Sequence, residues 1–534
     1  MKKYCLLITY NIFLSTLYAT AFAQNLFQVA VGGSGSDIAY TIIQTDDGGY
    51  VAAGSTNSFG AGLNDIYIVK INSNGLLLWT KTFGGSGADN ANCIIQTSDG
   101  GYIVAGSTNS FGAGLLDVMV LKINFTGNLE WFKVFGGEDI DFANSIIQTS
   151  DNSYIIAGET YSFGSGGEDM YIIKLDSGGN FVWNKAIGGF GDDRASCIVP
   201  TFDGGYAVAG RTTSYGAGFN DVFIMKLNES GLVMWSKTVG TSTGDAAFSI
   251  IQTNDSGFVL GGHTEPSQSQ HYLLKFNAIG TLEWTRYIAS SSGFITKVPV
   301  IQTPDGGYAL AGFTTIGSSG NDIIILKFLE NGTPQWFKKI GGTGSDIGCS
   351  LIPITSGGFA LAGYTSSYGS GGNDIFITKL DYNLNTCGNI TFLSISSGSW
   401  GSVSSPTPIV TIPTLTITSH TPIIGSGGTL TSICNIVNIS SQEIKAPNEF
   451  TLLQNYPNPF NPSTVIKFQI PNNEFVSLKI YDMLGHEVET LINEHLTSGT
   501  YEVEWNAEDY SSGIYFCKLQ AEEYVEIKKM ILMK

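Results

Sequence analysis

The sequence predicts an all-β chain whose main body is a seven-bladed β-propeller closed by its own N-terminal strand. Three observations support this prediction. A unit of 50 to 52 residues occurs seven times, each copy reads as four short strands, and an additional copy of the fourth strand precedes the first unit. Four short strands repeated at such a period are typical of propeller blades.

Each unit is marked by a tight turn followed by an aromatic residue. The turn is Asp-Gly-Gly in most copies, and its glycines offer the positive φ that a hairpin between the first two strands needs. The second strand is of the Tyr-Ile-Val-Ala-Gly type, the third of the Asp-Ile-Tyr-Ile-Val-Lys type, and the fourth begins near Trp. The turns begin at Asp47, Asp99, Asp151, Asp203, Asp255, Asp305 and Ser356.

The ends of the array favour a ring over an open solenoid. Six units carry the Trp of the fourth strand, but the seventh reaches Gly388 where its Trp should stand. The segment 27–33 aligns with 79–85 and stands 52 residues before it. The N-terminal strand can therefore complete the last blade and remove both free edges, so we predict a propeller over residues 24–386. The repeat resembles secreted bacterial β-propeller repeat proteins with Asp-rich blades, and this resemblance implies the fold but no activity.

The first residues are predicted to form a secretory signal peptide over residues 1–23. Lys2 and Lys3 supply the positive charge, an apolar stretch follows, and Ala21-Phe22-Ala23 offers a cleavage site. The mature chain is therefore expected to begin at Gln24, directly after Ala23. No later segment has the roughly 18 apolar residues of a spanning helix, so no transmembrane segment is expected after signal removal.

The composition restricts the partners. The formal net charge is −19, which argues against nucleic acid and anionic lipid because both need a basic protein surface. Hydrophobic residues make up 43% of the chain, only 13% are charged, and 67 are Gly. This balance suits many short strands joined by tight turns.

The segment 387–446 is predicted to be an extended or small β connector. It is rich in Ser, Thr, Ile and Pro, and no charged residue occurs between Asp381 and Glu443. Cys387 and Cys434 lie within this segment and are the best candidates for a disulfide in an oxidising compartment. Cys93 and Cys197 share one column of the repeat but stand two units apart, which makes them poor bridge partners.

The last stretch carries the most specific motifs of the chain. It opens with Asn-Tyr-Pro-Asn-Pro-Phe-Asn-Pro-Ser-Thr at 455–464, continues with Val-Ser-Leu-Lys-Ile-Tyr-Asp-Met-Leu-Gly at 476–485, and later shows Ser-Gly-Ile-Tyr-Phe at 512–516. Over about residues 447–534 it resembles the type A C-terminal sorting domain of the type IX secretion system. The resemblance implies a small immunoglobulin-like β-sandwich that the outer-membrane export machinery reads. It also implies a secreted or cell-surface protein that is exported through the periplasm.

Residues that recur in every blade are expected to be structural. The Asp that begins the third strand is expected to bind turn amides, and the Lys near its end to lie along apolar surface. Loops such as 164–169 and 369–374 could instead hold calcium through carboxylate and carbonyl oxygens, but spacing alone does not show convergence, so no cofactor is predicted. The recurring lysines are Lys70, Lys122, Lys174, Lys226, Lys275, Lys327 and Lys379, and the aspartates are Asp65, Asp117, Asp169, Asp221, Asp322 and Asp374.

One column varies while its neighbours stay fixed, at the end of the second strand. In a ring these residues occupy equivalent places on successive blades, so an acid, a base, an imidazole and two aromatics would line one arc that suits a sugar or a peptide. The alternative is that strand ends tolerate any residue. The column contains Ser55, Ser107, Glu159, Arg211, His263, Phe313 and Tyr364, and the last five are the predicted ligand-binding residues.

The fifth unit departs most from the repeat. His263, Glu265 and His271 could ligate a metal ion, but three ligands at loose spacing are weak evidence, and drift within a repeat explains them better. No metal site is therefore predicted.

We interpret the chain as a non-enzymatic binding propeller exported by its tail. No Gly-x-Ser-x-Gly, His-Glu-x-x-His or phosphate-binding Gly-Lys-Ser/Thr motif occurs, so no catalytic residue is assigned. One alternative is a glycan-processing enzyme whose acid and base come from Glu159, His263 or Tyr364, since carboxylate pairs need no local motif. The other is a surface scaffold without a ligand.

Overall fold

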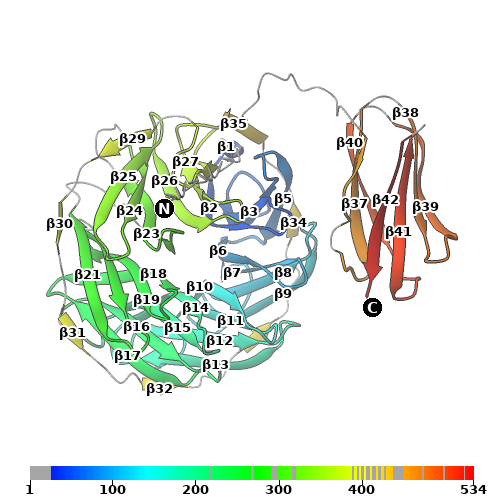
Figure 1. The fold of residues 1–534 in the computed structure, drawn as a ribbon. Helices are drawn as coiled ribbons and strands as arrows, with labels where there is room; N and C mark the ends of the chain where they lie inside the picture. Colours follow the sequence, from blue (N-terminus) through cyan, green and yellow to red (C-terminus); the bar gives the residue numbers. More distant parts are fainter. Residues whose placement is uncertain are drawn as a thin grey trace, which may run out of the picture. The chain divides into compact units, whose positions relative to one another are not determined.

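The computed structural model describes residues 26–216, 218–265, 270–289, 299–314 and 320–387, the strands between 390 and 436, and 450–533 apart from 456–457, 472–473, 497–498 and 522–523. The chain divides into two compact units, Met1–Asn438 and Ile439–Lys534, both drawn in Figure 1. In the described ranges, no helix is long and apolar enough to cross a membrane.

The first unit contains seven five-stranded antiparallel sheets, here called blades 1 to 7. Blades 1 to 3 begin with β2 (Asp37–Gln44), β3 (Tyr50–Thr56), β4 (Asp65–Ile71) and β5 (Leu77–Gly84); with β6 (Asp89–Gln96), β7 (Tyr102–Thr108), β8 (Asp117–Ile123) and β9 (Leu129–Gly136); and with β10 (Asp141–Gln148), β11 (Tyr154–Thr160), β12 (Asp169–Leu175) and β13 (Phe181–Gly188).

The next blades follow the same order. Blades 4 to 6 begin with β14 (Asp193–Pro200), β15 (Tyr206–Thr212), β16 (Asp221–Leu227) and β17 (Val233–Gly240); with β18 (Gly244–Gln252), β19 (Phe258–Glu265), β20 (Gln270–Phe276) and β21 (Leu282–Ala289); and with β22 (Val300–Gln302), β23 (Tyr308–Thr314), β24 (Asp322–Phe328) and β25 (Pro334–Ile340). Blade 7 contains β26 (Asp346–Pro353), β27 (Phe359–Thr365), β28 (Asp374–Leu380) and β1 (Leu26–Gly32).

The N-terminal strand completes the last blade, as the repeat alignment predicts. β1 pairs antiparallel with β28, with Gln28 opposite Thr378 and Val31 opposite Ile375. The first strands of neighbouring blades contact one another in sequence, and β2 of blade 1 contacts β26 of blade 7. Figure 1 shows the resulting propeller-like arrangement, with β6, β10, β14 and β18 toward its centre.

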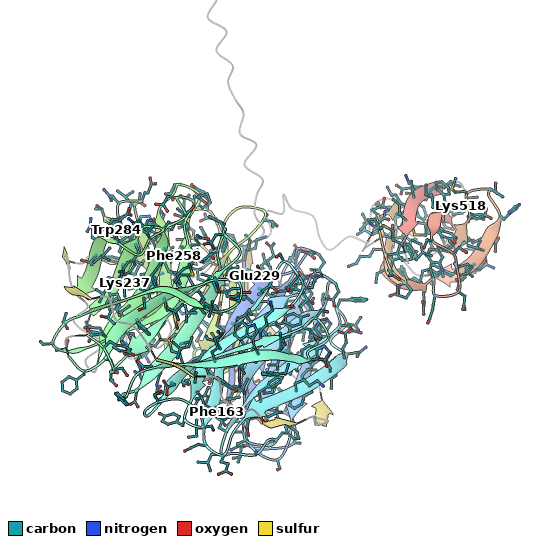
Figure 2. The ribbon with its side chains drawn as sticks, turned by 90° about the horizontal axis from the view of Figure 1, so that it is seen from below. Phe163, Glu229, Lys237, Phe258, Trp284 and Lys518 are labelled. Carbon is teal, nitrogen blue, oxygen red and sulfur yellow. The ribbon has the colours of Figure 1, made fainter. Side chains whose placement is uncertain are left out.

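Aromatic residues connect several blades to the next. In four described pairs of blades, the Trp near the start of the fourth strand contacts the aromatic residue that begins the second strand of the following blade, as with Trp79 and Tyr102, whose ring centroids are 6.3 Å apart. Phe258 and Trp284, labelled in Figure 2, make the corresponding contacts with Trp235 and Tyr308. Phe27 of β1 takes the Trp role toward Tyr50, at 5.8 Å. The N-terminal strand therefore replaces the missing seventh Trp strand in packing as well as in pairing.

The segment predicted as a connector is β-structured, but its strands belong to the blades of the first unit. We call these seven strands the belt. Each adds a fifth strand beyond the fourth strand of one blade, and the chain visits blades 6, 5, 4, 3, 2, 1 and 7 in that order. The belt comprises β29 (Ile390–Leu393), β30 (Ser396–Gly398), β31 (Ser402–Ser404), β32 (Ile409–Thr411), β33 (Thr416–Thr418), β34 (Ile423–Gly425) and β35 (Thr429–Ile436). Figure 1 shows β29, β30, β31 and β32 along the rim.

Two aspartates meet at the junctions between blades. At Gly84, a Cβ would lie 1.9 Å from Asp65 Oδ1 of blade 1 and 2.8 Å from Asp89 Oδ2 of blade 2, so only glycine fits there. Asp65 Oδ2 accepts the turn amides of Ala61 and Gly62, which confirms the predicted structural role. Burial and the neighbouring carboxylate raise the pKa of Asp65, and they raise the pKa of Asp117, Asp169 and Asp374 to about 6.

The recurring lysines are buried and ion-paired with the Asp-Gly-Gly turns. Lys70 Nζ lies 2.8 Å from Asp47 Oδ1, and blades 2 to 6 repeat this pair. In blade 7 the turn begins with Ser356, and among the described residues no carboxylate pairs with Lys379. Burial lowers the pKa of Lys379.

The second unit is built from two packed sheets. One contains β36 (Thr451–Leu452), β37 (Ser463–Ile470) and β40 (Gly499–Asn506), and the other β38 (Glu474–Tyr481), β39 (Glu487–Leu496), β41 (Gly513–Ala521) and β42 (Tyr524–Leu532). Trp505 is fully buried between them, and its ring contacts Phe460 and Tyr515. Alternating apolar residues in β37 and β38 supply the rest of this core.

Blade 7 offers a test of the lysine pair. We expect Ser356→Asp to raise the stability of the first unit by about 1 kcal/mol. The carboxylate, introduced in a partly exposed turn, would form an ion pair with the buried ammonium group of Lys379. Burial is the largest influence on the pKa of Asp255, but the hydrogen bonds from Lys275, Thr253 and the Gly257 amide, together with the charge of Lys275, outweigh it and lower that pKa to about 2. The gain should therefore be present above about pH 4 and disappear as the pH falls toward 2.

Thermal unfolding of the variant at pH 7 and pH 3 measures this gain. Ser356→Asn is the matched control, because its amide has the same shape without the charge. An equal gain from the two variants would contradict the ion-pair explanation.

Candidate functional site

The variable column lies at the junctions between blades. Its residues lie near the ends of the second strands, and their partners differ from blade to blade: Glu159 meets Arg194 of the following blade, whereas His263 stacks on Phe248 of its own blade. Ser55, Ser107, Glu159, His263 and Phe313 are buried, whereas Arg211 and Tyr364 are half-buried. The column is therefore split into local groups, of which one contains an accessible cation and two carboxyl groups.

The group at blades 3 and 4, here called the Arg194 cluster, contains Glu159, Tyr161, Glu168, Asp192 and Arg194. Arg194 Nε donates to Glu168 Oε2 and lies 3.6 Å from Glu159 Oε2. Tyr161 Oη donates to Glu168 Oε2 at 3.3 Å, and Arg194 Nη2 donates to Tyr161 Oη at 3.5 Å. The Glu168 amide donates to Asp192 Oδ1, which fixes the loop before β12.

Burial decides the ionisation of this cluster. The Glu168 side chain is fully buried, while that of Arg194 is 34% exposed. Burial and, second, the charge of Glu159 raise the pKa of Glu168 to about 8, although Arg194 opposes this rise. At neutral pH Glu168 is thus mainly a carboxylic acid. The Glu168 Oε1 atom is buried and has no hydrogen-bond partner in the described structure, and the Glu159 carboxyl group is near enough to raise the pKa of Glu168.

The arrangement presents donors outward and carboxyl groups inward. The carboxyl groups of Glu159 and Asp192 lie with Glu168 around the single Arg194 guanidinium. The Tyr161 residue is 40% exposed and adds an aromatic face beside the guanidinium. Such a set can orient a polar ligand by hydrogen bonds, and its carboxyl pair can hold or release a proton.

A second group forms at blades 4 and 5. His263 stacks on Phe248 with ring centroids 4.6 Å apart and meets His271 edge-on at 6.3 Å. Burial and then the Arg211 charge lower the pKa of His263 to about 4, and burial and then His263 lower that of His271 to about 3. Both rings are therefore neutral at physiological pH.

These imidazoles do not form a described metal centre. Among the described side chains, no three His, Cys, Asp or Glu groups converge on one point, and the Glu265 side chain is not among them. His263 Nδ1, His263 Nε2 and His271 Nδ1 have no hydrogen-bond partner in the described structure. In loop 164–169, the alternative calcium site considered from the sequence, the Asp169 Oδ2 atom accepts a hydrogen bond from the Ser165 amide.

A third group is aromatic and spans blades 6, 7 and 1. Phe313 packs with Ile347 and Cys349, and Tyr40 and Tyr364 pack against them. Burial raises the pKa of Tyr364 to about 12. The structure thus places Phe313 and Tyr364 in one cluster, separate from Glu159 and Arg194.

Sequence inspection of one column identified Glu159 but missed Glu168 and Arg194. Glu168 occupies the position before the third strand, where other blades have Asn or Leu, and Arg194 is the second residue of a first strand, where other blades are uncharged. A search for charged departures in all columns of adjacent blades would have found both. The equivalents of Glu168 are Asn64, Leu116, Asn220, Asn321 and Asn373, and those of Arg194 are Ile38, Asn90, Phe142, Ala246 and Ile347.

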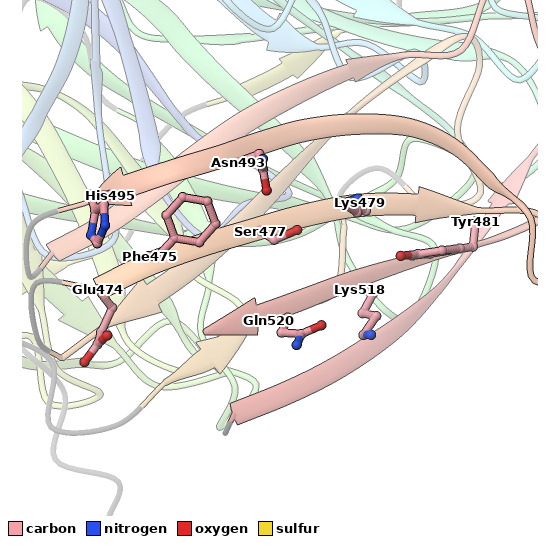
Figure 3. A pocket seen from close by; sticks show the side chains of 9 residues that line it. All are labelled: Glu474, Phe475, Ser477, Lys479, Tyr481, Asn493, His495, Lys518 and Gln520. Carbon is pink, nitrogen blue, oxygen red and sulfur yellow. The ribbon is translucent and has the colours of Figure 1, made fainter. Parts of the chain in front are cut away.

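The second unit carries a shallow pocket on the outer face of its four-stranded sheet. Phe475 and His495 meet with ring centroids 5.2 Å apart at one end, and Tyr481 and Lys518 lie at the other (Figure 3). Phe475 is 44% exposed. Aromatic and cationic groups on an exposed sheet face suit contact with another protein.

The predicted signal cleavage site and the predicted disulfide involve residues that the structure describes only in part or not at all. Ala23 and Gln24, the predicted cleavage site, lie outside the described residues. Cys387 is disulfide-bonded, and the backbone of its predicted partner Cys434 lies in β35, but the Cys434 side chain is not described.

Comparison with known proteins identifies the tail. A family described as the secretion system C-terminal sorting domain matches residues 454–533. The regulatory protein FlaEY of Caulobacter vibrioides is 22% identical over 396 residues, which cover 60% of this chain and 40% of that protein. The second unit is therefore a sorting domain, and the chain is a type IX-secreted protein of the cell surface or the extracellular space.

Two solved structures are also similar. PorZ, a surface component of the type IX secretion system of Porphyromonas gingivalis, matches with 13% identity and a TM-score of 0.41, over 94% of this chain and 60% of that one. A protein of unknown function from Dyadobacter fermentans matches with 12% identity and a TM-score of 0.40, over 66% of this chain and 98% of that one. The chain thus spans well under two thirds of FlaEY and somewhat less than two thirds of PorZ.

The raised pKa of Glu168 gives a pH-dependent prediction. Its folded-state pKa of about 8 exceeds the ordinary value of 4.5, so the folded chain binds the additional proton. This stabilising effect is complete below about pH 4.5 and disappears as the pH rises through 8. Between pH 5 and 9 we expect wild type to lose on the order of 2 kcal/mol relative to Glu168→Gln, which cannot ionise.

Thermal unfolding of both proteins across this pH range is the measurement. The exposed Glu138, in the connection between blades 2 and 3, provides the control variant Glu138→Gln, which should behave as wild type. Parallel pH profiles for wild type and Glu168→Gln would show that Glu168 is ionised in the folded chain.

Proposed function

We propose that this chain is an exported binding protein in which a closed seven-bladed β-propeller carries a glycan ligand at the Arg194 cluster. In this proposal the second unit is an immunoglobulin-like domain that directs type IX export. The single observation that carries the ligand site is the Arg194 cluster itself. It places Glu168 and Arg194 at one blade junction, at two positions where the other described blades have uncharged residues, and beside them Glu159 of the variable column.

Ring closure is supported by pairing and contact. β1 pairs with β28, β2 contacts β26 and β27, and the seven sheets follow one another without an unpaired fourth strand in the described chain. A closed ring holds the blade 3 and blade 4 side chains in fixed register, which pre-organises the cluster.

The chemistry of the cluster favours an uncharged glycan. Arg194 and Glu159 offer a donor and an acceptor to sugar hydroxyls, and the exposed ring of Tyr161 offers a stacking face. With Glu168 protonated, the cluster still contains the carboxyl groups of Glu159 and Asp192 beside one guanidinium, so it does not favour an anionic ligand. A peptide ligand is the other outcome that a binding screen would reveal.

An enzymatic function is the second candidate, and the carboxyl pair favours it. Glu168 can donate a proton near neutral pH, and Glu159 lies beside it, so the two could serve as acid and base toward a bound glycan. The binding proposal predicts saturable binding without turnover, whereas this alternative predicts a product.

A glycan and peptide binding screen on the purified mature chain tests the site. We expect Arg194→Ala and Tyr161→Ala to weaken binding at least about tenfold, because they remove the accessible donor and the stacking face. Arg286→Ala and Tyr382→Ala are matched controls at a half-buried Arg and an exposed Tyr outside the cluster, and they should bind as wild type.

The screen also decides between the alternatives. Loss of binding in Arg211→Ala or Tyr364→Ala, with Arg194→Ala unaffected, would move the site to another part of the variable column. Product formation from a bound glycan would favour the enzyme, and a screen without hits would favour a scaffold.

Export is tested separately from binding. In a cell with a type IX system, deletion of residues 450–534 should leave the chain in the periplasm, because the sorting domain is what the machinery reads. Phe475→Ala in the full chain tests the pocket of Figure 3, with the exposed Val525→Ala as control. Immunoblots of periplasm, cell surface and medium give the distribution, and unimpaired export of Phe475→Ala would exclude Phe475 from recognition.

A further inference from the structure

The ring has one weak point, which we call the seam. In blades 1 to 6 the third and fourth strands are consecutive in the chain, whereas β1 is joined to β28 by hydrogen bonds alone. Separation of β1 from β28 would open the ring and expose two unpaired strand edges.

The belt is longest at this seam. β35 has eight residues and pairs with β1 from Leu26 to Gly32, with an irregularity between Gln28 and Val29. The belt strands β30 to β34 have three residues each, and β29 has four. β1, which is not continuous in the chain with β28, is therefore paired with the longest strand of the belt, β35.

The two ends of the belt meet at the same residue of β1. Gln28 is the register partner of Cys434 in β35, and its Nε2 donates to the carbonyl oxygen of Cys387. Cys387 lies just before the belt and Cys434 near its end. Both are therefore neighbours of the same residue, the buried Gln28. The belt has by then visited all seven blades.

The other cysteines do not compete for this bond. Cys387 is disulfide-bonded, whereas Cys93, Cys197, Cys349 and Cys517 form no disulfide. Of the cysteines expected in the mature chain, only Cys434 is left as its partner.

We propose that a Cys387–Cys434 disulfide closes the belt into a covalent hoop around the seven blades, and that this hoop locks the seam at β1. The two thiols release two protons, and their two electrons pass to a disulfide-bearing thiol oxidant of the compartment that the chain crosses, which is reduced to two thiols. The hoop proposal rests on the proposed closed ring but not on the proposed ligand site. If the binding screen finds no ligand, the hoop proposal is therefore unaffected.

A closed hoop opposes unfolding in a specific way. Blades cannot separate outward while the hoop is intact, so opening the seam requires most of the fifth strands to detach together. We expect the intact hoop to slow unfolding in denaturant at least about tenfold relative to an open belt. Such kinetic stability suits a protein that acts outside the cell, where no chaperone refolds it.

The first experiment identifies the bond. Peptide mapping of the purified mature chain without reductant should yield one linked peptide pair that contains Cys387 and Cys434. Labelling of Cys387 and Cys434 as free thiols, or linkage of either to another cysteine, would overturn the proposal.

The second experiment distinguishes a hoop from a local crosslink. A protease site inserted at 405–408, between β31 of blade 4 and β32 of blade 3, allows the belt to be cut far from the seam while the disulfide stays intact. For a hoop, this cut should accelerate unfolding about as much as reduction of the uncut protein does, because each converts the hoop into an open belt. For a local crosslink, reduction accelerates unfolding and the distant cut does not, which would overturn the hoop.

Matched controls complete the design. The inserted but uncut protein shows the effect of the insertion, and a second site at 441–446, after the belt, gives a cut that leaves the hoop closed and the unfolding rate unchanged. Cys517→Ser removes a thiol from the sorting domain without touching the hoop. If the insertion at 405–408 prevents folding, the double variant Cys387→Ser with Cys434→Ser must unfold faster than Cys517→Ser, and equal rates would overturn the proposal.

Discussion

The pairing of β1 with β28 is the constraint on which the rest of the first unit depends. Blade 7 lacks a fourth strand of its own, so its third strand would present an open edge until the N-terminal segment returns to it. The same return places Phe27 against Tyr50, which reproduces the aromatic contact that Trp79 makes with Tyr102. The first strands of neighbouring sheets contact one another in sequence, and β2 of blade 1 contacts β26 of blade 7 as well.

The junctions show how a repeat keeps buried charge stable. Two carboxyl groups converge on a glycine at the blade boundaries, and burial together with the neighbouring carboxylate raises the pKa of Asp117, Asp169 and Asp374 to about 6. Blade 6 uses another solution, because Lys339 lies 2.9 Å from Asp322 and supplies the positive charge directly. The repeated carboxyl groups are thus explained by structure. The Arg194 cluster stands apart from them, since Glu168 and Arg194 occupy positions that are uncharged in the other blades.

The belt changes how the two units are connected. A segment without charged residues between 381 and 443 could have been a free linker, but each of its strands completes a blade. Its Thr and Ile residues suit this role, because β-branched residues are enriched in strands. The sorting domain therefore follows directly on the strand that covers β1, so the export signal and the closure of the ring are adjacent in the chain.

Much of the fold could be predicted from the sequence alone, because a repeat period, turn glycines and strand alternation are local patterns. They can be recognised without knowing which segments contact one another in the folded chain. They predicted four strands per unit, the return of β1 and the identity of the tail. They did not predict the belt, since three-residue strands carry too little pattern to indicate a partner. Nor did they bring Glu159, Glu168 and Arg194 together, because these come from a second strand, a loop and the next blade's first strand. Only the tertiary structure decided which column residues are buried and which carboxyl group keeps its proton, since both depend on desolvation by residues distant in the chain.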